Sequence, residues 1–521
     1  MKHKPATDFW PSNSRIIEFG VRDGAVGDQL IAVGFRYLGV VETDRQAERL
    51  GSRHPRLQQH LSVCRVATRV RQNNADVLIL NGGAASHLRR FRDIRHAKYV
   101  ACPLRNGPLL LWTILFWLGQ FLLLRLAWPR TVRVGTSRLI SFRVRRPRPY
   151  TAARRFVPQT LGIEGFFARL HTAGLRHAVL RWFESLPLLP AGEDLDLLVD
   201  DESLSAVRAL LDSGPGLQAV DLYSVYGAPG ADYQKLPYYP PYLAEQLLKR
   251  SVMHRELCAV PSPRDHFLSL AYHAVYHKGT ASGLPTSGQA KPVAARPEHC
   301  YANILERMAE RLGITVPITL TDLDAYLDRE GWRPPHDMLV RLSRKNKWLR
   351  TLVKHAVEDE TDAGLAVFLV RREALARGGV KRAAKLIAEH GFQVIETITI
   401  DPLRLETIVR SVRGGNWGQG PWPVSGGPPV AAIVAYDPAP LRPTRRQRRK
   451  FPFLANARLL KKDQIRGAFN AKHSESEHSN VIHSSDNGRE ARDYLRVIVP
   501  ERVEEILASV RRPQQRQSRA A

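Results

Sequence analysis

Five short apolar runs recur through the first hundred residues of the chain, and they constrain its fold more than any other feature. Each run is four to six residues long, and charged stretches that suit helices lie between the runs. Alternation of this kind predicts β-α-β units around a parallel sheet. Two later runs, 131–134 and 139–144, are expected to pair as a hairpin, so we predict one α/β domain over residues 15–149. The five runs are 16–19, 37–41, 61–66, 77–80 and 99–102.

A hydrophobic insert at residues 107–128 interrupts this domain. Residues 108–124 carry no charge and lie between Arg105 and Arg125. A spanning helix needs about 20 apolar residues, so the stretch is borderline in length. It is either a helix buried by another domain or a membrane-associating segment. A full span would separate domains that both need cytosolic nucleotides, so an in-plane or re-entrant segment on the cytoplasmic side of the membrane is favoured.

The chain is strongly basic, with 78 Lys and Arg residues against 50 Asp and Glu residues and a formal net charge of +28. Such a balance implies an anionic partner: nucleic acid, an anionic membrane face or phosphorylated small molecules. No nucleic-acid-binding motif accompanies the basic run at 442–450, so nucleic acid is the least favoured partner. The first fifteen residues are too polar for a secretory signal. Four scattered cysteines without a CxxC pair indicate a reducing compartment and argue against a structural zinc site.

A glycine-containing turn follows the first apolar run. Residues 16–27 read Ile-Ile-Glu-Phe-Gly-Val-Arg-Asp-Gly-Ala-Val-Gly, and a second run ends at Glu42 about twenty residues later. Glycines let the backbone approach a ligand closely, and an acid at that offset can accept hydrogen bonds from ribose hydroxyls. The order resembles class I S-adenosylmethionine-dependent methyltransferases, which have a Rossmann-like fold. The resemblance implies a cofactor site at Glu18, Gly20, Gly24 and Glu42; the alternative is a module with structural glycines.

A pair of aspartates marks the middle block, which we place at residues 160–357. Asp194 and Asp196 are two residues apart on an expected strand, so they share one face. Two such carboxylates can hold Mg²⁺ against a phosphate chain. With Asp221, the pair resembles the acidic triad of the nucleotidyltransferase (polymerase-beta-like) fold, here followed by a helical region. The Gly-Ser turn of that family is missing, and Arg181 stands near its place. The alternative is a solvated acidic strand end.

Two linked motifs lie in the last block, at residues 364–510. They are Asp463-Gln-Ile-Arg-Gly-Ala-Phe469 and Asn480-Val-Ile-His-Ser-Ser-Asp486. They resemble the motifs of nucleoside diphosphate kinase, and together with the matching segments that precede them the resemblance covers about 140 residues. The resemblance implies a ferredoxin-like fold and a phosphohistidine mechanism that uses ATP or another nucleoside triphosphate. The residues that it assigns are His483 as nucleophile, Arg466 and Arg371 as phosphate-binding cations, Asn480 for the sugar hydroxyl, and Ser485 beside the imidazole.

Several positions depart from that family. Arg371 stands where the family has a lysine, and Ser484 stands where it has a glycine after the histidine. The acid that orients the histidine has no clear match, because Asp493 or Tyr494 falls at its place. A Gly- and Trp-rich stretch at 414–423 replaces the segment that clamps the nucleotide. After this block, the basic tail at 511–521 is expected to be disordered.

The sequence thus predicts a multidomain α/β and α+β transferase associated with the membrane. Its main expected activity is phosphotransfer to a nucleotide or to a lipid-linked or surface-glycan acceptor, with Mg²⁺ as cofactor. Methyl transfer from S-adenosylmethionine would be a second activity. Two alternatives stay open: a non-catalytic nucleotide-binding scaffold at the membrane, and a nucleotidyltransferase centred on Asp194 and Asp196. The acceptor, the methylated atom and the oligomeric state are not specified by the sequence.

Overall fold

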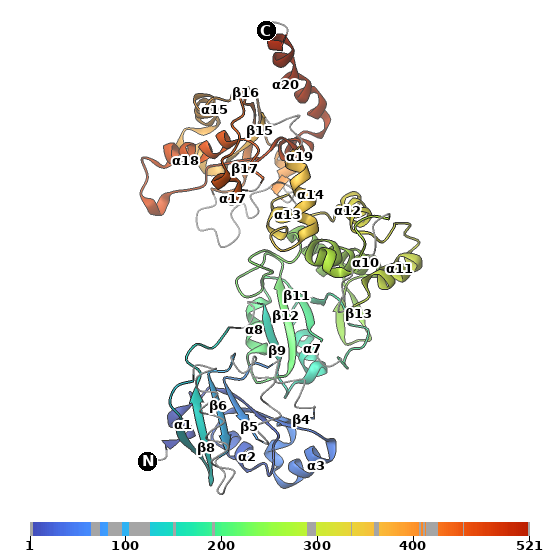
Figure 1. Cartoon of the computed structure of the whole chain (residues 1–521), viewed down its shortest axis with the longest axis vertical. Helices are drawn as coiled ribbons and strands as arrows, with labels where there is room; N and C mark the ends of the chain where they lie inside the picture. Colours follow the sequence, from blue (N-terminus) through green and yellow to red (C-terminus); the bar gives the residue numbers. More distant parts are fainter. Residues whose placement is uncertain are drawn as a thin grey trace. The chain divides into compact units, whose positions relative to one another are not determined.

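The fold is described from a computed structural model, shown in Figure 1. The described chain divides into two compact units, one of residues 1–238 and 244–262 and one of residues 239–243 and 263–521. The expected middle domain at 160–357 is therefore shared between the two units. The structure describes residues 4–63, 73–81, 96–103, 126–149, 153–189, 193–288, 299–334, 336–358, 364–405, 408–409, 412, 426–451 and 453–518.

Most of the hydrophobic insert at 107–128 lies outside the described residues, because only 126–128 belong to them. Among the residues that are described, no helix combines the length and the apolar character that crossing a membrane requires.

The first unit begins with an eight-stranded sheet in the order β1-β7-β8-β6-β5-β2-β3-β4. Strands β2 to β6 are parallel neighbours, while β8 runs antiparallel to both β6 and β7. The predicted parallel strands and the predicted hairpin are both confirmed; the two-residue strand β1 was not expected. The strands are β1 (Lys4–Pro5), β2 (Arg15–Phe19), β3 (Arg36–Val41), β4 (Leu61–Val63), β5 (Val77–Leu80), β6 (Tyr99–Pro103), β7 (Arg130–Val134) and β8 (Ser137–Arg143).

Both faces of this sheet are buried, which explains why its central strands are continuous apolar runs. Ile17 and Phe19 of β2 face one hydrophobic cluster, and Ile16 faces the other. The strand order and the single antiparallel strand are consistent with a Rossmann-like, methyltransferase-like fold. Its helices are α1 (Ala6–Phe9), α2 (Ala25–Ala32), α3 (Asp44–Arg53) and the 3₁₀ helix η1 (Pro55–His60).

A second, four-stranded sheet follows in the same unit, in the order β10-β11-β12-β9. Strands β11 and β12 are parallel, and the two outer pairs are antiparallel. A small hairpin of β13 (Val252–His254) and β14 (Cys258–Val260) completes the unit. The other elements here are β9 (Arg154–Val157), α7 (Gly162–Thr172), β10 (His177–Val179), β11 (Leu195–Val199), α8 (Leu204–Leu211), β12 (Gln218–Ser224) and α9 (Pro241–Lys249).

The second unit opens with a helical region. Helix α10 (Pro263–Tyr272) continues directly into a one-turn π-helix, η3 (His273–Lys278). Asn346 donates from Nδ2 to the carbonyl oxygens of Val275 and Tyr276, 2.8 and 3.2 Å away, so the wider turn has partners for its backbone groups. The remaining elements are η4 (Gly279–Ser282), α11 (Tyr301–Leu312), α12 (Leu320–Arg329), α13 (His336–Leu342) and α14 (Lys347–Glu358).

The last sheet is antiparallel throughout, in the order β16-β17-β15-β18. Together with α15 and α18 its strands follow the β-α-β-β-α-β pattern of a ferredoxin-like unit. The elements are β15 (Leu365–Arg371), η6 (Arg372–Arg377), α15 (Gly379–Glu389), β16 (Gln393–Thr399), η7 (Pro402–Arg404), β17 (Pro429–Tyr436), α17 (Arg445–Lys450), η8 (Ala457–Lys461), α18 (Lys462–Asn470), η9 (Glu475–Glu477), β18 (Ile482–Ser484), α19 (Gly488–Ile498), η10 (Pro500–Arg502) and α20 (Val503–Ser518).

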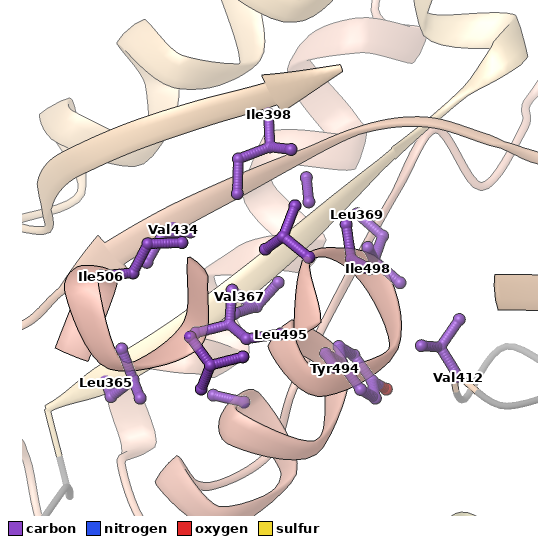
Figure 2. Close-up of a cluster of buried hydrophobic side chains, with 14 of the residues drawn as sticks. Leu365, Val367, Leu369, Ile398, Val412, Val434, Tyr494, Leu495, Ile498 and Ile506 are labelled. Carbon is purple, nitrogen blue, oxygen red and sulfur yellow. The ribbon is translucent and has the colours of Figure 1, made fainter. Parts of the chain in front are cut away.

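Side chains alternate along β15, so each face of this sheet has its own core. Phe368 and Val370 pack with residues of α15 and α18 on one face. Val367 and Leu369 pack with α19 and α20 on the other, as Figure 2 shows for the cluster that includes Tyr494. Helix α20 extends through Ser518, into the tail at 511–521 that the sequence analysis expected to be disordered. Its many Gln and Arg residues are good helix formers.

Candidate functional sites

The glycine turn predicted to bind a cofactor lies at the carboxyl edge of the first sheet. The N–H of Gly20 donates to the carbonyl of Val40, so the turn lies at the ends of β2 and β3. Gly20 and Gly24 both have positive φ, +72° and +83°, which glycine adopts without strain. A β carbon on Gly24 would lie 2.8 Å from side-chain atoms of His54 and Leu57. Gly24 then forms the N-cap of α2, and the first N–H of the helix, that of Ala25, donates to Oδ1 of Asp23 at 3.0 Å.

The carboxyl group of Glu18 is held inside the protein rather than at the edge. Oε2 accepts a hydrogen bond of 2.6 Å from the hydroxyl of Tyr37, and Oε1 accepts one from the side-chain amide of Asn81. Burial raises the pKa of Glu18, and the two hydrogen bonds oppose that shift. Glu18 of β2 is therefore bonded to Tyr37 near the start of β3 and to Asn81 just after β5, and its predicted contact with a cofactor is not supported by this placement.

Glu42 is exposed directly after β3, at the same edge as the glycine turn. Its N–H donates to the side-chain carbonyl of Gln46, 3.2 Å away, while Nε2 of Gln46 donates to the carbonyl of Val21 at 2.7 Å. Gln46 thus ties the backbone of Glu42 to the glycine turn and leaves the Glu42 carboxyl group at the surface. An exposed acid beside a positive-φ glycine turn fits the ribose end of a nucleoside cofactor.

The three aspartates predicted to bind magnesium do come together, but an arginine lies between two of them. Asp196 on β11 is in register with Asp221 on β12. The guanidinium of Arg154 donates two hydrogen bonds of 2.7 Å to Asp194, and its Nε lies 2.9 Å from Asp221. A two-pronged pair of this kind is the strongest ordinary arginine–carboxylate contact. Arg154 therefore stands where the metal was expected.

A second arginine pairs with the remaining aspartate. Arg181 donates to Asp196 at 2.6 Å and to the hydroxyl of Tyr238 at 2.7 Å. Burial raises the pKa of Asp196 to about 7, against the opposing effect of Arg181. In the part of the chain that the structure describes, no group of three His, Cys, Asp or Glu side chains is arranged to hold a metal ion. The three carboxylates predicted to hold Mg²⁺, those of Asp194, Asp196 and Asp221, each pair with an arginine here, and the magnesium site stays a prediction.

The predicted nucleophile, His483, lies on β18 opposite Leu369 of β15. Its Nε2 is 3.3 Å from the hydroxyl of Tyr494 on α19. That hydroxyl donates to Oε1 of Glu490 at 3.0 Å, one helical turn earlier. The side chain of Asn487 caps α19 by accepting the N–H of Glu490 at 2.8 Å, so the helix that carries both partners begins at a fixed position.

Two arginines approach the same strand. Arg466 of α18 donates from Nε and Nη2 to the carbonyl of Ile482, at 3.0 and 2.9 Å. Arg371 ends β15, and its N–H donates to the carbonyl of Val481 at 2.9 Å. Burial, with Arg466 nearby, lowers the pKa of Arg371 to about 10.

The last two predicted residues, Asn480 and Ser485, lie on either side of β18 in different surroundings. Asn480 comes two residues before β18, and its carbonyl oxygen would be 2.4 Å from a β carbon on Gly426, so Gly426 packs directly on it. Ser485 is fully buried, and its hydroxyl accepts the N–H of Val367 at 3.1 Å. The predicted role of Ser485 beside the imidazole is not supported, since its oxygen is used between strands. The 414–423 stretch lies outside the described residues.

Glu490 was missed by the sequence analysis, and Tyr494 was noted there only as a mismatch. The available signal was their spacing: residues four apart lie on one face of a helix. An acid one turn before a tyrosine can therefore reach the same neighbour through the tyrosine hydroxyl.

Comparisons with known proteins add little to this geometry. No family model and no curated protein sequence matches the chain. Among solved structures, it is similar to a protein described as an RNA methyltransferase from Pyrococcus horikoshii, with 9% identity, a TM-score of 0.19, and coverage of 25% of this chain and 75% of that one. It is also similar to a human methyltransferase 10 domain containing protein, with 13% identity, a TM-score of 0.18, and coverage of 26% and 73%. Neither likeness defines what this chain does.

Proposed function

We propose that the first domain binds S-adenosylmethionine and that the chain is a methyl-transferring enzyme. One observation carries the proposal: the glycine turn, the N-terminus of α2 and the exposed Glu42 meet at the carboxyl edge of a methyltransferase-like sheet. In open α/β sheets this edge is where nucleoside ligands bind.

The residues at this edge fit the parts of the cofactor. The carboxylate of Glu42 would accept hydrogen bonds from the two ribose hydroxyls. The N–H of Ala25 is bonded to Asp23, so the next N–H groups of α2, those of Val26 and Gly27, would face the carboxylate of the methionine part, which a helix N-terminus favours. Gly20 and Gly24 would allow the backbone to come close to the ligand. The bound cofactor supplies an electrophilic methyl group, and this chain's residues bind and orient it.

Photo-crosslinking tests this proposal without an acceptor. Full-length protein is irradiated with radiolabelled S-adenosylmethionine, digested and mapped by mass spectrometry. We expect label on peptides covering residues 20–46, and competition by unlabelled S-adenosylhomocysteine. Label spread over the chain, or label that the competitor does not remove, would contradict the proposal.

A second candidate function rests on a separate observation, the placement of His483 beside Tyr494, Arg371 and Arg466 in a β-α-β-β-α-β unit. This is phosphotransfer through a phosphohistidine. An imidazole nitrogen of His483 would form a bond to the γ-phosphorus of a nucleoside triphosphate as the bond to the β–γ bridging oxygen breaks. The nucleoside diphosphate leaves, and a hydroxyl or phosphate acceptor then takes the phosphoryl group and regenerates the imidazole.

The arginines would supply the positive charge that this transfer requires. Catalysis of phosphoryl transfer depends mainly on positioning and on fixed cations around the transferring group. Arg466 is held to the backbone of β18 next to His483, so its position is fixed by the strand. A nucleotide or a lipid-linked glycan at the inner membrane face is the acceptor class we propose, in keeping with the basic charge of the chain.

Labelling with γ-³²P-ATP and Mg²⁺ tests the second candidate. We expect label on the full-length protein that is lost in acid and kept in alkali, and that disappears in His483→Ala. His478→Ala is the matched control, because this exposed histidine lies on the same segment. Equal labelling of wild type and His483→Ala would refute the assignment.

A further inference from the structure

We propose that Tyr494 and Glu490 are positioning residues that hold His483 as the Nε2–H tautomer, with the reactive lone pair on Nδ1. This inference rests on the proposed phosphotransfer function of His483. Neither Tyr494 nor Glu490 is proposed to contact the substrate.

The direction of each hydrogen bond follows from counting protons. A tyrosine hydroxyl has one proton to donate. That proton goes to Oε1 of Glu490, 3.0 Å away. The 3.3 Å contact between the hydroxyl oxygen and Nε2 of His483 must then be a donation from the imidazole. A neutral imidazole carries one N–H, so its lone pair lies on Nδ1.

Glu490 is anchored well enough to set this direction. Its side chain is fully buried. Oε2 accepts the N–H of Asp486 at 2.5 Å, while Oε1 accepts the hydroxyl of Tyr494. Both oxygens act as acceptors, as expected of an ionised carboxylate. These three residues, His483, Tyr494 and Glu490, form a hydrogen-bonded relay. Through Glu490 the relay is bonded to the turn that joins β18 to α19.

Tyr494 is fixed by packing as well as by its hydroxyl. Its ring is buried in the cluster shown in Figure 2, together with Leu369 and Leu495. The tyrosine stands at the place where the kinase family has its orienting acid, and the acid of this chain lies one turn away. The hydroxyl of Tyr494 therefore connects His483 to Glu490, where the family has a carboxylate in direct contact with the histidine.

Other charged groups around the relay act on the same imidazole. Arg466 is bonded to the carbonyl of Ile482, next to His483 along β18, and Arg371 lies two residues beyond Leu369, the β15 partner of His483. Cations near an imidazole would favour its neutral form. Lys462 pairs with Asp486 at 3.2 Å, so these two charges offset each other. Glu490 is the group expected to favour the protonated imidazole, through Tyr494.

The test measures the imidazole directly and needs no catalysis. Full-length protein is modified with diethyl pyrocarbonate from pH 5 to pH 9, and the rate at His483 is read by mass spectrometry. We expect both Tyr494→Phe and Glu490→Gln to shift the midpoint of the His483 profile to lower pH. Tyr494→Phe removes the hydroxyl that accepts from the imidazolium, and Glu490→Gln removes the negative charge next to that hydroxyl. His478 on the same molecule reports any general change in reactivity. Tyr436→Phe removes a hydroxyl from the same core and should leave the profile unchanged.

Phosphohistidine formation gives a second readout. We expect the labelling rate of Tyr494→Phe to fall about tenfold, the factor that corresponds to one hydrogen bond to a charged group. Circular dichroism establishes that each variant is folded. A folded Tyr494→Phe or Glu490→Gln variant with the wild-type profile overturns the relay. Absence of label on wild type overturns the phosphotransfer function instead, and the pH profile still decides whether Tyr494 and Glu490 act on the imidazole.

Discussion

The hydroxyl of Tyr37 lies 2.6 Å from Oε2 of Glu18, and this buried bond joins two parallel strands just before the glycine turn. The sequence offered two acids for the cofactor site, and this contact separates their roles. Glu18 is used inside the sheet, where burial raises its pKa. Glu42 is exposed at the same edge and is the acid available to a ligand.

Gly24 should be the least replaceable residue of the turn. Gly24→Ala places a β carbon 2.8 Å from His54 and Leu57 at a positive φ. Gly34→Ala is the matched control, because Gly34 also has positive φ but has no atom within 4 Å of a β carbon. We expect about 1 kcal/mol of lost stability at Gly34 and more at Gly24. Hydrogen exchange of peptides from β2 and β3 measures both; equal losses would contradict the close packing.

Arg154 should both stabilise the second sheet and exclude metal from it. Arg154→Ala leaves Asp194 and Asp221 facing each other, with an expected loss of about 2 kcal/mol. Arg155→Ala, on the same strand, is the control. We expect Mn²⁺ to increase protection from hydrogen exchange in β11 and β12 of the Arg154 variant and to leave wild type unchanged. Metal-dependent protection of β11 and β12 from hydrogen exchange in wild type would instead support the predicted magnesium site.

Asp196 should make the second sheet less stable as the pH rises. Its pKa is raised to about 7 by burial in the folded chain, against about 4 in an unfolded one. The folded state therefore holds a proton that the unfolded state releases. The stability contributed by this group is present below about pH 4 and is lost as the pH rises through about 7. Hydrogen exchange of β11 from pH 4 to pH 8 should show this decline in wild type and not in Asp196→Asn; parallel profiles would contradict it.

Ser485 should prove to be a structural residue. Its hydroxyl accepts the N–H of Val367, so Ser485→Ala leaves a buried donor without that acceptor. We expect a loss of about 1 kcal/mol in the stability of the last sheet. We also expect phosphohistidine labelling per folded molecule to persist. Ser476→Ala, at an exposed position, is the control for stability. Loss of label with unchanged stability would instead support a role for Ser485 beside the imidazole.

The strands of the first sheet could be predicted because strands buried on both faces are continuous apolar runs. Strand β1 could not, since two residues carry no pattern of their own and gain their structure by pairing with β7. The hydrophobic insert and the stretch at 414–423 that replaces the nucleotide clamp stay predictions, because residues 104–125 and 413–425 lie outside the described structure.

The candidate sites could be predicted only in part, because a motif does not show the contacts that its residues make with distant parts of the chain. A motif shows which residues share a strand, but it does not show which residue from another strand neutralises them. Arg154 reaches Asp194 across 40 positions, and no local pattern in the sequence signals that pair. The same reason explains why Tyr494 was read as a mismatch for the orienting acid. The hydroxyl of Tyr494 meets the carboxylate of Glu490 only when α19 has formed.

Titration calorimetry with S-adenosylmethionine tests the central claim most directly. We expect full-length wild type to bind one equivalent and Glu42→Ala to bind at least about tenfold more weakly, since the ribose hydroxyls lose a charged acceptor. Glu48→Ala removes an exposed acid from α3 and should bind as wild type does. Folded wild type that takes up no cofactor, or that binds it no better than Glu42→Ala, would contradict the account.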